Sequence, residues 1–114
     1  DADNAKPSSM QVAIENFKQL ENSSKLMILG DMFELGNESY KEHLQTINQV
    51  IETKIPSIFI GEHFFKVQVK NDRVKYFQTI QDYFIHLNDS PISQELLLIK
   101  GSRGMALERI LKKI

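Results

Sequence analysis

Hydrophobic residues three, four and seven positions apart recur in several segments of the chain, and this spacing places them on one face of a helix. The spacing predicts helices over residues 8–20, 39–54, 80–87 and 107–114, with one or two further helical turns over residues 64–67. Polar residues fill the intervening positions. Each segment is therefore expected to bury one apolar face and expose the other.

Residues at the helix starts can accept hydrogen bonds from free backbone amides. Two pairs match the capping-box pattern: Ser8 with Gln11, and Ser39 with Glu42. Thr79 is suited to cap the third helix, and Pro7 is suited to the first turn of the first. These residues fix where the helices should begin.

Short, mostly apolar runs alternate with the predicted helices. They cover residues 25–29, 57–60, 74–77 and 96–99, and the first two end at Gly30 and Gly61. Strands that are apolar throughout are typical of a parallel sheet covered on both faces. The sequence therefore predicts an α/β domain with a mostly parallel sheet and helices on both faces.

Ligands of such sheets bind outside the carboxyl ends of the strands. The segments at that edge should be residues 30–36, 61–63 and 100–104. We expect any binding chemistry to be concentrated in these loops.

Composition narrows the class of protein further. The 114 residues can form one hydrophobic core, and 41% of them are hydrophobic. Fourteen basic and fifteen acidic residues give a net charge of −1, so the chain has no net positive charge that would attract nucleic acid. The chain has no cysteine, and its apolar runs are too short to span a bilayer. We expect a cytoplasmic protein that binds no nucleic acid and does not insert into membranes.

The loop over residues 30–36 carries two carboxylates, Asp31 and Glu34, directly after a predicted strand. Carboxylates in this position can orient an amine, a ribose hydroxyl or a water bound to Mg²⁺. The alternative is structural: Gly30 and Gly36 make the turns, and Asp31 caps local backbone amides.

The loop over residues 100–104 combines Lys100, Ser102 and Arg103 with two glycines at a strand-to-helix junction. Such a junction can bind a phosphate or a carboxylate. The alternative is that Ser102 caps the helix and the cations are solvated. The spacing of a Walker A loop is absent from the whole chain.

The three histidines do not form a recognisable metal site. His43 lies beside the apolar stripe of its helix, and His63 and His86 have no partner at a metal-ligand spacing. Core or surface roles are expected for all three, and no metal site is predicted.

Three motifs in order carry a resemblance to a known family. They are Asn4-Ala5-Lys6-Pro7-Ser8-Ser9-Met10, then Gly30-Asp31-Met32-Phe33-Glu34-Leu35-Gly36 with His43, then Lys100-Gly101-Ser102-Arg103-Gly104-Met105 with Glu108. In this order the chain resembles, over its whole length, the carboxy-terminal domain of the MurF family of Mur ligases. The resemblance implies a Rossmann-like third domain, residues 1–114, of a three-domain enzyme. The start at Asp1, without an initiator Met, also favours a piece of a longer polypeptide.

The family implies an ATP-dependent ligase of peptidoglycan precursor synthesis. In it, ATP phosphorylates the terminal carboxylate of UDP-N-acetylmuramoyl-tripeptide, and the amine of D-alanyl-D-alanine attacks the acyl phosphate. The phosphate loop and the Mg²⁺ ligands belong to the amino-terminal and central domains. The isolated third domain is therefore expected to be inactive, to hold no catalytic residue and to bind neither ATP nor Mg²⁺ tightly.

The resemblance also implies site residues. Asp1, Asn4 and Lys6 are expected to face the nucleotide, although Asp3 and Lys6 depart from the Tyr and Asn usual in the family. The expected wall of the D-alanyl-D-alanine cleft consists of Asp31, Glu34, Lys100, Ser102 and Arg103.

Two other interpretations remain open. One is a stand-alone, flavodoxin-like module that binds an anion or a partner protein at the same strand ends. The other is the matching domain of a sister ligase of the folylpolyglutamate or cyanophycin synthetase type.

Overall fold

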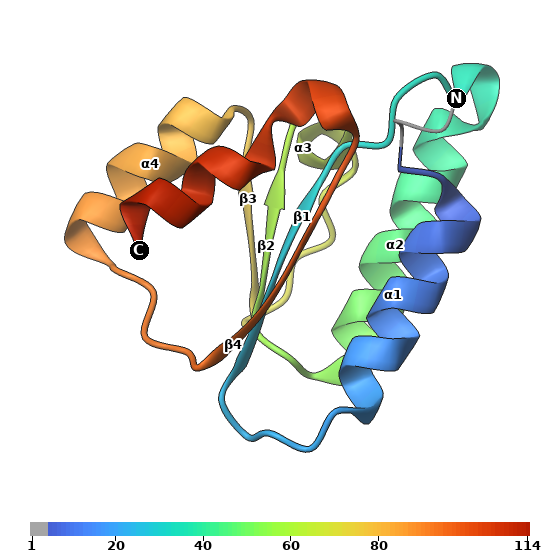
Figure 1. Cartoon of the computed structure of the whole chain (residues 1–114). Coiled ribbons are helices and arrows are strands. Elements are labelled where there is room, and N and C mark those ends of the chain that lie inside the picture. The colour runs from blue at the N-terminus through green and yellow to red at the C-terminus, as the bar shows by residue number, and fades with distance from the viewer. Residues whose placement is uncertain (1–4) are drawn as a thin grey trace.

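A computed structural model of the chain describes residues 5–114. Helices and strands alternate as the hydrophobic pattern predicts (Figure 1). In chain order the elements are α1 (Pro7–Gln19), β1 (Lys25–Gly30), the 3-10 helix η1 (Gly36–Glu38), α2 (Ser39–Thr53), β2 (Ser57–Ile60), α3 (Glu62–Val67), β3 (Val74–Phe77), α4 (Ile80–Asp89), β4 (Leu96–Lys100) and the 3-10 helices η2 (Arg103–Met105) and η3 (Leu107–Lys113).

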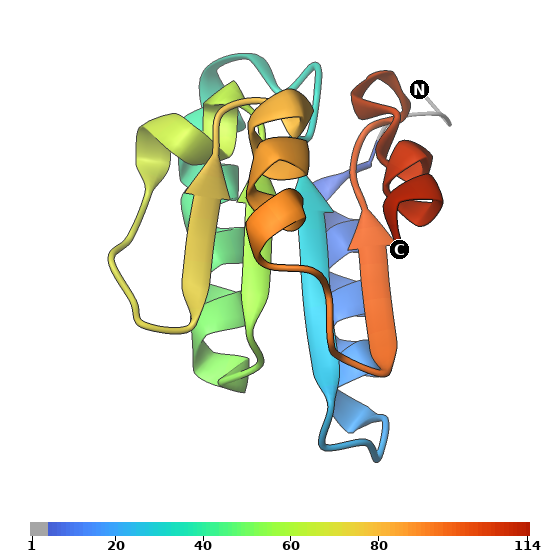
Figure 2. The ribbon, with the colours of Figure 1, turned by 90° about the vertical axis from the view of Figure 1, so that its left-hand side faces the viewer.

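The four strands form one parallel sheet in the order β3-β2-β1-β4. Figure 2 shows the four arrows pointing the same way, with β1 between β2 and β4. The chain builds the sheet outward from β1 to β3 and then crosses back to place β4 on the other side of β1. The predicted α/β fold with a parallel sheet is confirmed.

Helices cover both faces of the sheet, as predicted. α1 and α2 pack on one face, and α4 and η3 on the other (Figure 1). The residues of β1 after Lys25 are all buried, whereas every residue of the edge strand β4 is half-buried. Among the described residues no helix is both long and apolar enough to cross a membrane.

Two predicted capping boxes are wrong. α1 begins one residue early, at Pro7, and the Ser9 hydroxyl, not Ser8, exchanges hydrogen bonds with the backbone of Lys6. Ser39 is already helical, and its hydroxyl contacts the His43 ring at 3.2 Å instead of capping α2. The Thr79 cap is confirmed, because its hydroxyl accepts the Asp82 amide at 3.1 Å.

The last predicted helix is a 3-10 helix, η3, rather than an α-helix. With three residues per turn, residues three apart share a face. Leu107 and Ile110 are therefore buried, while Leu111 and Ile114 are more than half exposed. The apolar pattern located this helix correctly but did not distinguish its period.

Candidate functional site

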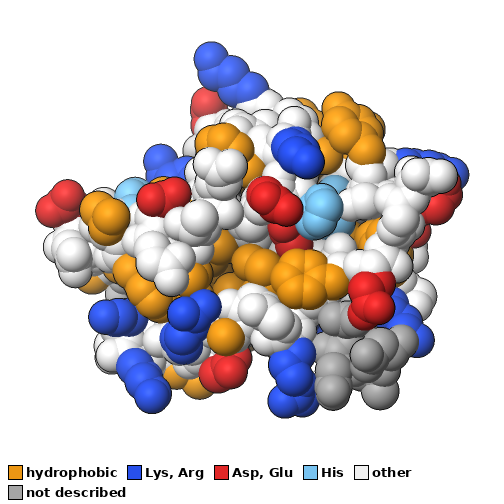
Figure 3. Space-filling model, turned by 90° about the horizontal axis from the view of Figure 1, so that it is seen from above, with side chains coloured by type: hydrophobic (Ala, Val, Ile, Leu, Met, Phe, Trp, Pro, Cys, Tyr) orange, Lys and Arg blue, Asp and Glu red, His pale blue; other side chains and the backbone are white. Residues whose placement is uncertain are grey.

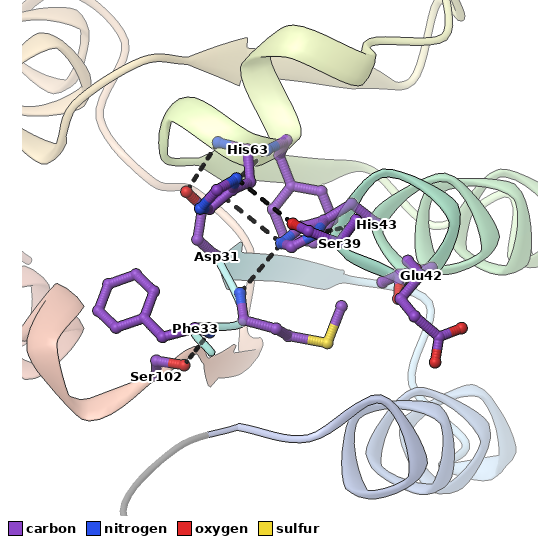
Figure 4. A network of polar contacts seen from close by, with 10 residues as sticks. Asp31, Phe33, Ser39, Glu42, His43, His63 and Ser102 are labelled. Carbon is purple, nitrogen blue, oxygen red and sulfur yellow. Dashed lines mark hydrogen bonds and ion pairs between the residues drawn. The ribbon is translucent and has the colours of Figure 1, made fainter. Parts of the chain in front are cut away.

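The loops that follow β1 and β4 lie against each other at the carboxyl edge of the sheet (Figure 4). The Ser102 amide donates to the Asp31 carbonyl at 3.0 Å, and the Ser102 hydroxyl accepts the Phe33 amide at 2.8 Å. Gly101 permits this approach, because a Cβ there would lie 2.9 Å from the Gly30 Cα. The two glycine-flanked loops therefore form one continuous surface, as their position after adjacent parallel strands predicts.

Asp31 is almost fully buried, with 1% of its surface exposed. Its two carboxylate oxygens accept the backbone amides of His63 at 2.8 Å and Phe64 at 3.0 Å, at the start of α3. The structural alternative is right that Asp31 caps backbone amides but wrong that these amides are local, because they lie at the start of the next helix. The predicted contact between Asp31 and substrate stays a prediction.

His43 is fully buried and is hydrogen-bonded through both ring nitrogens. Its Nε2 atom accepts the Met32 amide at 3.1 Å, and its Nδ1 atom donates to the Ser39 carbonyl at 2.7 Å. Burial lowers the pKa of His43 below 6.5, outweighing the opposite effects of the Ser39 carbonyl and the Asp31 carboxylate. The ring is therefore neutral at pH 7, and the predicted core role of His43 is confirmed.

A cavity of about 370 Å³ opens at this edge, between the ends of β1, β2 and β3 and the 3-10 helices. Figure 3 views this edge from above and shows carboxylates and a histidine beside hydrophobic side chains. The residues around the cavity are Asp31, Phe33, Gly61, Glu62, His63, Gln78, Thr79, Ile80, Gly104, Met105 and Arg109.

The sequence placed the Gly61–His63 loop at this edge but did not single out Gln78 or Arg109. Arg109 is oriented by hydrogen bonds from its guanidinium to the Ala106 carbonyl at 2.9 Å and the Met105 carbonyl at 3.0 Å. The position of Gln78, directly after β3, was the available signal, because β3 ends at the same edge as β1 and β2.

The predicted substrate-binding residues fall around three separate hollows. Asp31 lines the cavity described above, whereas Lys100, Ser102 and Arg103 surround a second hollow beside η3, of about 310 Å³. Glu34 lines a third hollow, of about 570 Å³, at the start of α1.

The same predicted residues also differ in how far their side chains are exposed to solvent. Glu34 and Arg103 are exposed, Lys100 is half-buried and Ser102 is buried. Glu34 has a φ of 62°, in the left-handed region that residues other than glycine rarely adopt. The two loops thus combine buried polar groups with charges that solvent can reach.

Of the predicted nucleotide-binding residues, Lys6 is exposed and lines the same hollow as Glu34. Asp1 and Asn4 lie outside the described residues. Over residues 5–114, no group of three or more histidine, aspartate or glutamate side chains is arranged to hold a metal ion.

The parallel sheet and its polar carboxyl edge define a Rossmann-like α/β domain. The chain is 30% identical over 111 residues to the UDP-N-acetylmuramoyl-tripeptide–D-alanyl-D-alanine ligase of Rickettsia prowazekii, covering 94% of this chain and 25% of the relative. It is 33% identical over 122 residues to the ligase of the same name from Bacillus subtilis, covering 100% and 27%. No protein-family model matches the chain.

Solved structures agree with these relatives. A crystal structure of MurF from Acinetobacter baumannii superposes with a TM-score of 0.79 at 29% identity, covering 96% of this chain and 25% of that chain. The chain thus spans about a quarter of the length of the ligases that it matches. It is homologous to the carboxy-terminal domain of the MurF ligases.

Proposed function

We propose that this chain acts as the carboxy-terminal domain of an ATP-dependent ligase that joins D-alanyl-D-alanine to UDP-N-acetylmuramoyl-tripeptide. The observation that carries the proposal is the 30–33% identity to ligases of this name over nearly the whole chain. The same similarity favours this function over a stand-alone flavodoxin-like module and over a sister ligase. The reaction would belong to peptidoglycan precursor synthesis in the cytoplasm, and so to cell-wall biogenesis, cell shape and cell division.

Each of the two chemical steps requires two reactants to be held in line for transfer. ATP phosphorylates the tripeptide carboxylate, and the dipeptide amine then displaces phosphate from the acyl phosphate, so positioning and charge neutralisation supply most of the catalysis. Residues 5–114 offer no cluster of metal ligands. From the resemblance to these ligases we infer that the Mg²⁺ ligands and the phosphate loop belong to other domains, and we expect the isolated chain to be inactive.

The loops at the carboxyl edge would form one wall of the D-alanyl-D-alanine cleft. Lys100 and Arg103 are the cations suited to the carboxylate of the dipeptide, because guanidinium and ammonium groups pair well with carboxylates. Glu34 is the accessible carboxylate suited to orient the amine. Asp31 and Ser102 line the same edge from buried positions. Asp1, Asn4 and Lys6 would face the nucleotide.

The test is an activity assay on the parent protein from which this sequence comes. Purified full-length protein is incubated with ATP, Mg²⁺, D-alanyl-D-alanine and UDP-N-acetylmuramoyl-tripeptide, and the pentapeptide product is measured by mass spectrometry. We expect product that depends on all three substrates. A parent that lacks a phosphate loop, or that ligates glutamate to a folate instead, would contradict the proposal.

A further inference from the structure

The first three residues after β1 form an unusually well anchored loop. Their backbone amides each donate to an acceptor from a different segment: Asp31 to the Ile60 carbonyl of β2, Met32 to the His43 ring of α2, and Phe33 to the Ser102 hydroxyl after β4. Backbone amides that lose their ladder partner at a strand end must find another acceptor when buried. Of the three acceptors, only His43 can change its protonation state or tautomer.

The partners of His43 determine its tautomer. The Met32 amide can only donate and the Ser39 carbonyl can only accept, so the proton must reside on Nδ1 and the lone pair on Nε2. The edge of the ring also packs against Phe64, with centroids 4.6 Å apart. Nε2 lies 3.9 Å from Oδ1 of Asp31, too far for a hydrogen bond. In the other tautomer the proton would be on Nε2. The Nε2–H group would then face the Met32 N–H group, and no hydrogen bond could form between them.

We propose that His43, in its neutral Nδ1–H form, is a positioning residue that holds the Asp31–Phe33 loop through the Met32 amide and thereby fixes where Glu34 is presented. Glu34 follows the anchored residues directly, is exposed and has a φ of 62°. Because Phe33 is tied to Ser102, the hydrogen bond at Met32 also fixes the loop that carries Arg103. His43 itself is fully buried, so it acts through the loop and not by contact with a substrate.

Two substitutions separate this role from simple core packing. In His43→Gln the amide oxygen can occupy the place of Nε2 and accept the Met32 amide. In His43→Asn the shorter amide corresponds to Nδ1 and leaves the Met32 amide without an acceptor. Because Asn is also smaller than His, a residue that only fills space would make His43→Asn exchange faster at core amides generally, whereas loss of the acceptor acts on the Met32 amide specifically.

The first measurement is structural. In the ¹⁵N NMR spectrum of the wild-type chain at pH 7, we expect the His43 Nδ1 to be protonated and the Nε2 to be unprotonated. We expect hydrogen exchange of the Met32 amide to be at least about tenfold faster in His43→Asn and within about threefold of wild type in His43→Gln. A protonated Nε2, or equal exchange in the two variants, would overturn the proposal.

The second measurement is kinetic and rests on the proposed function. In the parent ligase, we expect His43→Asn to raise the KM for D-alanyl-D-alanine about tenfold with the KM for ATP nearly unchanged, and His43→Gln to restore the dipeptide KM. Equal loss in both variants, or an unchanged dipeptide KM in His43→Asn, would overturn the role in substrate positioning. If the wild-type parent has no ligase activity, the proposed function fails, whereas the tautomer and exchange results still decide the role of His43 in the loop.

Discussion

The loops after β1 and β4 look alike in the sequence but are built differently. Each begins at the carboxyl end of a strand and contains glycines and charged residues. The loop after β1 turns Asp31 inward, and its consecutive amides are bound by three other segments. In the loop after β4 only Ser102 is buried, while Lys100 and Arg103 remain accessible. The charge of Asp31 therefore serves structure, whereas Glu34 and Arg103 are exposed to solvent and Lys100 is half-buried.

This difference predicts that inward groups control stability, with His43 affecting substrate binding only through the loop that it holds, and that outward groups act on activity alone. Substitutions at Gly61, Asp31, Ser102 and His43 should change the free energy of unfolding. Substitution of an outward cation should instead change substrate affinity.

Gly61→Ala should have the largest effect on stability. Gly61 has a φ of 130°, and a Cβ there would lie 2.2 Å from the Asp31 Cγ. We expect a loss of about 3 kcal/mol or more in the free energy of unfolding, measured by urea denaturation, because strain and steric overlap add. Gly36→Ala is the matched control: its φ is 56° but nothing lies within 4 Å, so only about 1 kcal/mol should be lost. Equal losses at the two glycines would show that the buried carboxylate is not tightly held.

Asp31→Ala should rank second. The change removes both acceptors of the His63 and Phe64 amides at the start of α3. We expect about 2 kcal/mol of destabilisation by the same measurement, because a lost cap leaves buried donors unsatisfied. Asp72→Ala, at an exposed turn position, should change stability by less than about 0.5 kcal/mol. Equal effects of the two substitutions would remove the structural role of Asp31.

Ser102→Ala should cost less, about 1 kcal/mol, because it leaves one amide, that of Phe33, without its acceptor. The exposed Ser93 provides a matched control whose replacement by Ala should be nearly neutral. If thermal or urea unfolding does not distinguish Ser102→Ala from Ser93→Ala, then the contact between the two loops contributes nothing to stability.

The smallest effect concerns pH. The folded-state pKa of His43 lies below the 6.5 of the unfolded chain, so the unfolded state binds more protons once the pH falls below 6.5. The stability contributed by neutral His43 is present above pH 6.5 and is lost as the pH falls toward the folded-state pKa. Between about pH 7.5 and about pH 5.5, wild type should therefore lose more stability than His43→Gln, which has no group that titrates in this range at position 43. Parallel pH profiles for the two proteins would contradict the buried, neutral ring.

Much of the fold could be predicted because hydrophobic spacing reports directly on burial. The apolar runs located every strand within a residue, and alternation with helices indicated the parallel sheet. Helix starts were less predictable, because Ser9 and Ser8 both fit the start of α1 and only the backbone path decides between them. The period of η3 was also missed, since Leu107 and Ile110 fit helices of three and of 3.6 residues per turn.

The edge of the sheet was predicted correctly, but the direction of individual side chains was not. Asp31 and Glu34 lie three residues apart in one loop, yet one is buried and the other exposed. That difference depends on the position of α3, whose amides come from residues more than thirty positions away. Long-range contacts of this kind leave no local signal. The sequence could therefore identify both loops as candidates without separating their structural residues from their accessible ones.

The most direct measurement is the catalytic efficiency of the parent ligase carrying Arg103→Ala, with Lys70→Ala as a control in an exposed segment before β3. We predict that kcat/KM for D-alanyl-D-alanine falls at least about tenfold in Arg103→Ala and stays within about twofold of wild type in Lys70→Ala. Wild-type efficiency in Arg103→Ala would contradict the assignment of this loop to the dipeptide cleft.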